Sequence, residues 1–169
     1  HLGSLASQGM RIGTFPVGID TQQFHRMAKD VAETKVVRTL RERTPNLVIG
    51  VDRLDYSKGL ELKFEAYQRF LHANTTWCDR ATFLQITPKS RSAIAEYAAM
   101  EQSLDALSGR INSAFGNVLW TPIRYVTRAY GRDILAGLFR IARVGVVTPL
   151  RDGMNLVAKE YIAAQDEED

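Results

Sequence analysis

One arrangement occurs twice in this chain and restricts its fold more than any other feature. An apolar run leads into a charged glycine turn, and a helical pattern follows. The first copy joins residues 47–51 to the turn at residues 52–59 (DRLDYSKG), and the second joins residues 144–147 to the turn at residues 149–156 (PLRDGMNL). Such turns bring backbone N–H groups and charged side chains together where a ligand can lie. Two of them predict one shared crevice that suits an anion and a sugar.

The rest of the chain continues the alternation of strand and helix patterns. Strands are expected at residues 10–16, 47–51, 81–87, 123–126 and 144–147, and helices at residues 20–43, 62–71, 92–109 or a little beyond, 132–141 and 155–165, with Asp20 as the first N-cap. This order predicts an α/β fold with a parallel sheet and helices on both faces. In such sheets ligands bind at the carboxyl ends of strands, where both charged turns lie.

Composition supports one globular domain and excludes several classes of protein. The 169 residues are 45% hydrophobic, which is enough for a core. A net charge of +3 with interspersed signs argues against nucleic-acid binding but allows a local anion site. The single Cys78 excludes an internal disulfide and a cysteine-based zinc cluster, and is expected to be a loop or partly buried thiol.

We expect neither a metal nor a membrane span. His25 and His72 have no partner at metal-ligand spacing, so surface or packing roles are favoured. No apolar run approaches the ~20 residues that cross a bilayer, and no signal peptide opens the chain. A cytoplasmic enzyme is therefore expected, and the sequence leaves homo-oligomer formation open.

Three strings carry a resemblance to a known family. VDRLDYSKG (residues 51–59), VTPLRDGMNLVAKEY (residues 147–161) and FPVGID (residues 15–20) resemble the trehalose-6-phosphate synthase family, glycosyltransferase family 20. These are retaining enzymes with two facing Rossmann-like domains, the GT-B architecture. The likeness spans nearly the whole chain and implies a fragment: residues 1–45 would be the end of the amino-terminal domain and the interdomain connection, and residues 46–169 an incomplete carboxy-terminal Rossmann-like donor-binding domain.

The resemblance implies an activity and its catalytic cations. A nucleoside diphosphate glucose, expected to be UDP-glucose, would transfer glucose to glucose 6-phosphate with retention, giving trehalose 6-phosphate. Arg53 and Lys58 match the residues that hold the donor phosphates and assist departure of the diphosphate, and fixed cations suit that charge. No cofactor or metal is implied. From composition alone both residues could equally be solvated, while Asp55 and Tyr56 between them are expected to support the turn.

The remaining site residues are also assigned by resemblance. Asp152, Gly153, Met154, Asn155 and Leu156 match the loop that holds the donor glucose and a phosphate, with a positive φ allowed at the glycine. Further matches are Glu160 for the ribose hydroxyls, Ile86 and Tyr130 for the uracil pocket, and Arg91 for the phosphate of the acceptor. The residue types alone leave alternatives open: Asp152 as a helix N-cap, Glu160 as a surface residue paired with a neighbour, Arg91 as solvated, and Ile86 and Tyr130 as core.

Two other functions stay under consideration. The first is a catalytically inactive module that binds a nucleotide sugar or regulates an enzyme, although the presence of Arg53, Lys58, Asp152 and Glu160 favours the enzyme. The second is a nicotinamide-dependent dehydrogenase, which is weakened because no GxGxxG follows an expected strand.

Overall fold

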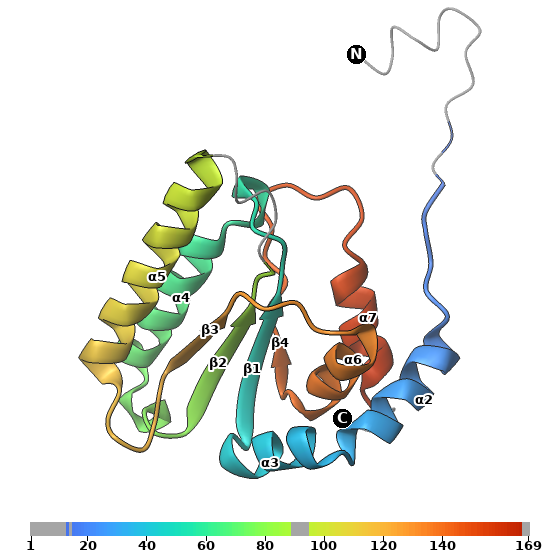
Figure 1. The fold of residues 1–169 in the computed structure, drawn as a ribbon, viewed down its shortest axis with the longest axis horizontal. Coiled ribbons are helices and arrows are strands. Elements are labelled where there is room, and N and C mark those ends of the chain that lie inside the picture. Colours follow the sequence, from blue (N-terminus) through green and yellow to red (C-terminus); the bar gives the residue numbers. More distant parts are fainter. Residues whose placement is uncertain (1–12, 14, 89–94, 167–169) are drawn as a thin grey trace, which may run out of the picture.

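The computed structural model describes residues 13, 15–88 and 95–166. Four parallel strands form its sheet in the order β3-β2-β1-β4. They are β1 (Asn46–Val51), β2 (Ala81–Ile86), β3 (Ile123–Val126) and β4 (Val144–Gly145). From β1 the chain adds β2 and β3 on one side and then returns to place β4 on the other side (Figure 1). The point where the order reverses therefore lies between β1 and β4, which is where ligands bind in open α/β sheets.

Helices cover both faces of this sheet, as predicted (Figure 1). The helices α4 (Leu60–Ala73) and α5 (Ala95–Phe115) enclose one core, in which the rings of Phe64 and Phe83 meet edge to face with their centroids 6.0 Å apart. The helices α2 (Thr21–Ala32), α6 (Arg132–Ile141) and α7 (Leu156–Ala164) enclose the other, around Phe24 and Phe139. Two short 3-10 helices, η1 (Tyr56–Lys58) and η2 (Thr75–Trp77), complete the described elements with α3 (Lys35–Arg43).

Most predicted elements are confirmed, with shifted bounds. The helix expected at residues 20–43 is two helices, because Thr34 is extended (φ −66°, ψ 149°) and its N–H donates to the Val31 carbonyl at 3.0 Å. The Asp20 cap is confirmed, since its carboxylate accepts from the Gln23 N–H at 2.9 Å. Of the strand expected at residues 10–16, only residues 13, 15 and 16 are described, and they are not a strand.

The long helix α5 ends at Phe115, beyond the expected end near residue 109. The Asn112 amide donates to the Ile123 carbonyl and accepts from the Ile123 N–H, both at 2.9 Å. One side chain thus continues the hydrogen bonding at the beginning of β3. Asn112 therefore joins α5 to β3.

The core-facing side of α4 differs from the predicted apolar side. Leu62 is 54% exposed and Phe70 is 37% exposed, whereas Lys63 is 4% exposed between the buried Leu60 and Phe64. A lysine on the inner face of a helix needs a partner for its charge. The partner of Lys63 is Asp52, the first residue after β1.

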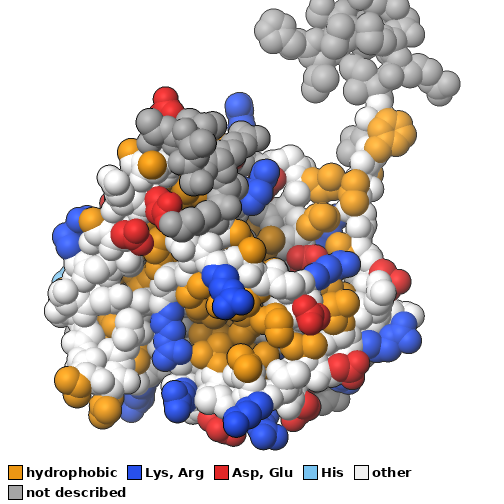
Figure 2. All heavy atoms as spheres, viewed as in Figure 1, with side chains coloured by type: hydrophobic (Ala, Val, Ile, Leu, Met, Phe, Trp, Pro, Cys, Tyr) orange, Lys and Arg blue, Asp and Glu red, His pale blue; other side chains and the backbone are white. Residues whose placement is uncertain are grey.

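On the face seen in Figure 2, basic and acidic side chains are interspersed around apolar ones, so neither sign of charge forms a continuous patch there. Within the described residues, no helix combines the length and apolar character required to cross a bilayer. The same residues contain no group of three histidine, cysteine, aspartate or glutamate side chains that could hold a metal ion. Cys78 is a free thiol of intermediate exposure, as expected.

Candidate functional site

The two charged turns meet at the carboxyl ends of β1 and β4, as the sequence predicts. In the turn after β1, the Asp55 carboxylate accepts from the backbone N–H of Ser57 at 2.9 Å and from its hydroxyl at 2.7 Å. The hydrogen bond from the Ser57 hydroxyl, then that from its N–H, lowers the pKa of Asp55 below the ordinary 3.8. Asp55 therefore supports the turn, as expected.

A left-handed residue closes this turn. Gly59 has φ 60° and ψ 38° and leads directly into α4. It is the one glycine with a positive φ among the described residues, so the positive φ allowed at Gly153 is not adopted. A Cβ at Gly59 would lie 3.1 Å from Cγ of Leu150, which shows how closely the second loop approaches the first.

The loop after β4 is joined to the turn after β1 by hydrogen bonds and an ion pair. The Ser57 carbonyl accepts from the N–H groups of Leu150 at 2.7 Å and Arg151 at 3.2 Å. Lys58 Nζ donates to Asp152 Oδ2 at 2.6 Å, and the two side chains are 12% and 20% exposed. The hydrogen bond from Lys58 lowers the pKa of Asp152. The structure thus brings together a cation and a carboxylate that lie 94 positions apart in the sequence.

Asp152 is not the N-cap of α7. Asn155 has that role, since its side chain accepts from the Ala158 N–H at 3.3 Å. Asn155 Nδ2 also donates to Asp152 Oδ2 at 2.9 Å, and the Met154 N–H lies 3.4 Å from Asp152 Oδ1. The capping alternative for Asp152 is therefore wrong, and its carboxylate instead organises the loop ahead of the helix.

The segment that precedes α2 reaches the same loop. Lys159 Nζ donates to the Val17 carbonyl at 2.7 Å, and the Val17 N–H lies 3.0 Å from the sulfur of Met154. The FPVGID string therefore lies against the second turn. The domain boundary at residue 46 stays a prediction.

On α7, Glu160 pairs with Arg132 of α6, whose Nε lies 3.3 Å from Glu160 Oε1. The Arg132 guanidinium carbon also lies 5.1 Å from the centre of the Phe24 ring. The predicted pairing with a sequence neighbour is thus replaced by one across two helices. Glu160 is 18% exposed in its side chain and keeps access to solvent.

The other predicted site residues are more scattered. Arg53 is exposed, and no ion pair joins it to a described residue. Tyr130 is 37% exposed, whereas Ile86 is 1% exposed within the core, so its place in a uracil pocket stays a prediction. Arg91 lies outside the described residues.

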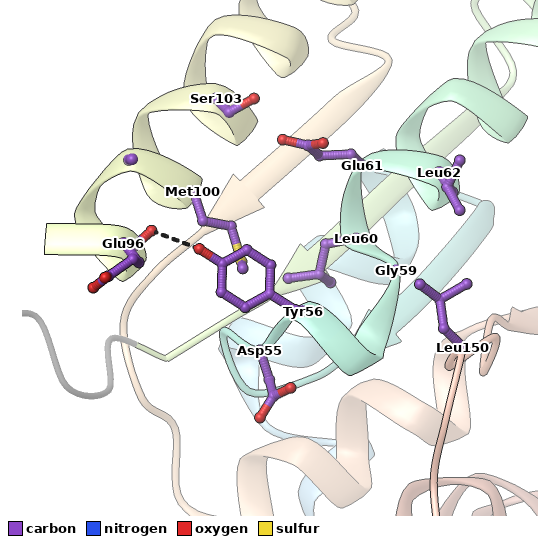
Figure 3. A pocket seen from close by; sticks show the side chains of 11 residues that line it. Asp55, Tyr56, Gly59, Leu60, Glu61, Leu62, Glu96, Met100, Ser103 and Leu150 are labelled. Carbon is purple, nitrogen blue, oxygen red and sulfur yellow. Dashed lines mark hydrogen bonds between the residues drawn. The ribbon is translucent and has the colours of Figure 1, made fainter. Parts of the chain in front are cut away.

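A pocket of about 460 Å³ lies beside η1 (Figure 3). Tyr56, Leu60 and Met100 line it, and the Tyr56 hydroxyl donates to the Glu96 carbonyl at 3.2 Å. Arg53, Lys58 and Asp152 are not among its lining residues. It separates the turn from α5, and Tyr56 supports the turn by spanning this space.

Sequence reasoning missed the buried group under the two turns. Lys63 Nζ donates to Asp52 Oδ2 at 2.6 Å, and the side chains are 1% and 4% exposed. Gln85 Nε2 donates to the same carboxylate oxygen at 3.1 Å. The available signal was the helical spacing of Lys63 with Leu60 and Tyr67, which places it on the inner face of α4.

Comparison with known proteins gives the family. A family model described as glycosyltransferase family 20 matches residues 3–169. The chain belongs to glycosyltransferase family 20. The predicted resemblance is thus confirmed, and so is the α/β fold with its parallel sheet.

Individual proteins also match over most of this chain. A trehalose-6-phosphate synthase of Sinorhizobium fredii is 50% identical over 171 residues, which is 99% of this chain and 37% of that protein. A UDP-forming alpha,alpha-trehalose-phosphate synthase of Burkholderia xenovorans, solved in complex with glucose-6-phosphate, is 45% identical with a TM-score of 0.90, covering 93% of this chain and 35% of that one.

A third relative is the Escherichia coli trehalose-6-phosphate protein solved with UDP-2-fluoro glucose, 37% identical with a TM-score of 0.84 over 93% of this chain and 35% of that one. The chain thus spans about a third of the length of these relatives. The solved relatives have the GT-B fold, and this chain matches one part of it.

Proposed function

We propose that this chain supplies the donor site of a retaining glucosyltransferase that makes trehalose 6-phosphate from UDP-glucose and glucose 6-phosphate. The observation that carries the proposal is the contact between Lys58 and Asp152 at the reversal of strand order, 2.6 Å between Nζ and Oδ2. Membership of family 20 supports the reaction, as do the relatives solved with glucose-6-phosphate and with UDP-2-fluoro glucose.

The geometry suits a diphosphate beside a sugar. A lysine ammonium has three N–H donors, so Lys58 can contact a phosphate while it holds Asp152. The exposed Arg53 on the same turn can meet the diphosphate from a second side. Asp152 has a second oxygen, Oδ1, whose one described contact is the long one to the Met154 N–H at 3.4 Å, and a sugar hydroxyl can donate to it.

In the proposed reaction the bond from the anomeric carbon to the diphosphate oxygen breaks, and the electron pair leaves with UDP. A hydroxyl oxygen of glucose 6-phosphate forms the new bond on the same face, and its proton passes to the departing phosphate oxygen. Arg53 and Lys58 stabilise the charge that grows on the diphosphate. Glu160 is proposed to accept hydrogen bonds from the ribose hydroxyls, and Ile86 and Tyr130 are proposed to lie near the base. Gly153 follows Asp152 in the loop, and the next three residues are proposed to offer backbone N–H groups to the donor: Met154, Asn155 and Leu156. Arg91 is proposed to contact the phosphate of the acceptor.

The test compares the isolated 169-residue chain with the intact protein. We expect the intact protein to form trehalose 6-phosphate and the isolated chain to bind UDP in a calorimetric titration without forming product, since half a crevice cannot orient two sugars. Titration with UDP, GDP and their glucose conjugates identifies the donor base.

If the isolated chain formed product at the rate of the intact protein, the proposal that this chain supplies only the donor site would be wrong. An intact protein that binds UDP-glucose without transferring glucose would instead be a nucleotide-sugar-binding or regulatory module. The cytoplasmic location, homo-oligomer formation and the absence of nucleic-acid partners stay predictions.

A further inference from the structure

A buried ion pair lies under the two turns, and neither of its members is among the proposed ligand contacts. Asp52 is the first residue after β1, and its side chain is 4% exposed. Lys63 is on the first turn of α4, where its side chain is 1% exposed and its Nζ lies 2.6 Å from Asp52 Oδ2. Gln85, at the end of β2, donates to the same oxygen and to the Thr87 hydroxyl. The carboxylate is therefore fixed from two elements at once.

Lys63 also reaches the strand on the other side of β1. Its Nζ lies 3.3 Å from the Val146 carbonyl, one residue beyond β4. The strands β1 and β4 pair through only two residues each, and the Val146 N–H then donates to the Ile49 carbonyl at 2.7 Å. Beyond that bond the Lys63 ammonium joins the two strand ends, Asp52 on one and Val146 on the other.

The bridge lies at the base of both site loops. Arg53 follows Asp52 directly, and Lys58 is five residues further along the same turn. Val146 begins the segment that leads to Leu150 and Asp152. The loops then meet again where the Ser57 carbonyl accepts from the Leu150 N–H, and once more at the ion pair of Lys58 and Asp152.

Stability alone does not account for this arrangement. Removing two charges from water costs several kcal/mol per ion, and well-packed apolar residues of similar volume are often as stable or more stable. A pair of side chains with defined hydrogen-bond directions does, however, fix the distance between the elements that carry it. The ends of β1 and β4 lead to Lys58 and Asp152, whose spacing such a buried ion pair would fix.

We propose that Lys63 is a positioning residue of the donor site, which sets the spacing of the two loops through Asp52 and the Val146 carbonyl. It does not contact the donor. Through this spacing Lys63 aligns Lys58, which contacts the diphosphate in the proposed function, with Asp152, which contacts the sugar. The consequence for catalysis rests on the proposed function, whereas the consequence for loop spacing does not.

The first test uses the ligand-free intact protein. Lys63→Met keeps an unbranched side chain that is only one atom shorter but removes the bridge, so the N–H groups of Leu150 and Arg151 should exchange with deuterium at least about tenfold faster. The matched control is Tyr67→Phe, which removes a buried hydrogen bond of the same helix, 2.9 Å to the carbonyl of Ala81 at the amino end of β2, the end opposite the two loops. In that variant the two N–H groups should exchange as in the wild type.

The second test is a double-mutant cycle in binding of UDP-glucose. In the wild-type background Asp152→Asn should weaken binding about tenfold, and in the Lys63→Met background by less than about twofold, because the carboxylate is already misplaced. Lys63→Arg, which can donate to both acceptors, should restore most of the affinity and most of the effect of Asp152→Asn. A general loss of stability would leave the two effects independent.

If the Lys63→Met variant does not fold, the double variant Asp52→Leu/Lys63→Met is used instead, because it removes both charges together. Unchanged exchange at Leu150 and Arg151 in a folded variant, or independent effects in the cycle, would overturn the proposal. A wild-type protein that binds no nucleotide sugar would refute the proposed function only, because the exchange experiment still decides the role of Lys63 in loop spacing.

Discussion

The turn after β1 and the loop after β4 face each other, but they are stabilised differently. Within the first, Asp55 accepts two hydrogen bonds from Ser57, and Gly59 closes the turn with a positive φ. The second leaves a strand of two residues and is held largely from outside, by the Ser57 carbonyl and by Lys58. The first turn is thus a preformed support, and the second loop takes its position from it. Under the proposed function, the position of the sugar contact would therefore depend on the turn that holds the phosphates.

The largest effect is expected from the two cations of the first turn. Arg53→Ala and Lys58→Ala should each lower kcat about ten- to a hundredfold, because each charge-assisted contact is worth roughly 1.5–3 kcal/mol. Steady-state kinetics and melting curves of the intact protein check this. Near wild-type kcat with earlier melting would make the residue structural.

The same two variants also test whether Lys58 joins the turn after β1 to the loop after β4. Only Lys58→Ala removes the contact with the second loop, so it should also raise the pKa of Asp152 toward the ordinary value, while Arg53→Ala leaves that pKa low. A carboxyl titration followed by NMR distinguishes them. An equal rise in both variants would show that the two loops are not joined through Lys58.

A smaller effect, about tenfold in affinity, is expected from the carboxylates of the second region. Asp152→Asn should weaken binding of UDP-glucose far more than binding of UDP, because its proposed partner is a sugar hydroxyl. Glu160→Gln should weaken both ligands by a similar factor, since a ribose contact is common to them. Calorimetric titration of each variant with both ligands gives the comparison. If Asp152→Asn weakens both ligands equally, the residue only organises the loop.

The two glycines give a matched pair for stability. Gly59→Ala places a Cβ in the left-handed region and 3.1 Å from Leu150, so it should cost about 1–2 kcal/mol. Gly153→Ala meets nothing within 4 Å in the described structure and needs no positive φ, so it should change the melting temperature little. Equal losses in the two variants would mean that the second loop is as rigid as the first.

The smallest expected effect is the pH dependence of the first turn. The folded-state pKa of Asp55 lies below 3.8 because of the Ser57 hydrogen bonds. Its contribution to stability is therefore complete above that pH and is lost as the pH falls through the lower folded-state value. Asp55→Asn keeps an acceptor but does not titrate, so its unfolding free energy should fall less between about pH 5 and pH 2. Parallel acid slopes for wild type and variant would rule out this role.

The sequence predicts the sheet and the location of the site because both depend on local patterns. Apolar runs, charged turns and the Asp20 cap are short-range signals, and their alternation predicts a parallel sheet but not the order of its strands. The sequence misses what the tertiary structure decides: the break at Thr34, the burial of Lys63, and Asn155 rather than Asp152 as the cap of α7. The ion pair of Lys58 with Asp152 follows from the order of β1 and β4, not from any spacing along the chain.

The contacts of Val17 have a thermodynamic consequence. Its carbonyl accepts from Lys159 and its N–H approaches the sulfur of Met154, so the stretch before α2 touches the same loop as the proposed donor. If a ligand favours one arrangement of that loop, it favours the matching position of Val17 by the same free energy, and the converse holds equally. Under the proposed domain division and function, a domain movement that displaces the stretch before α2 would change donor affinity, and donor binding would shift that movement by the same coupling free energy.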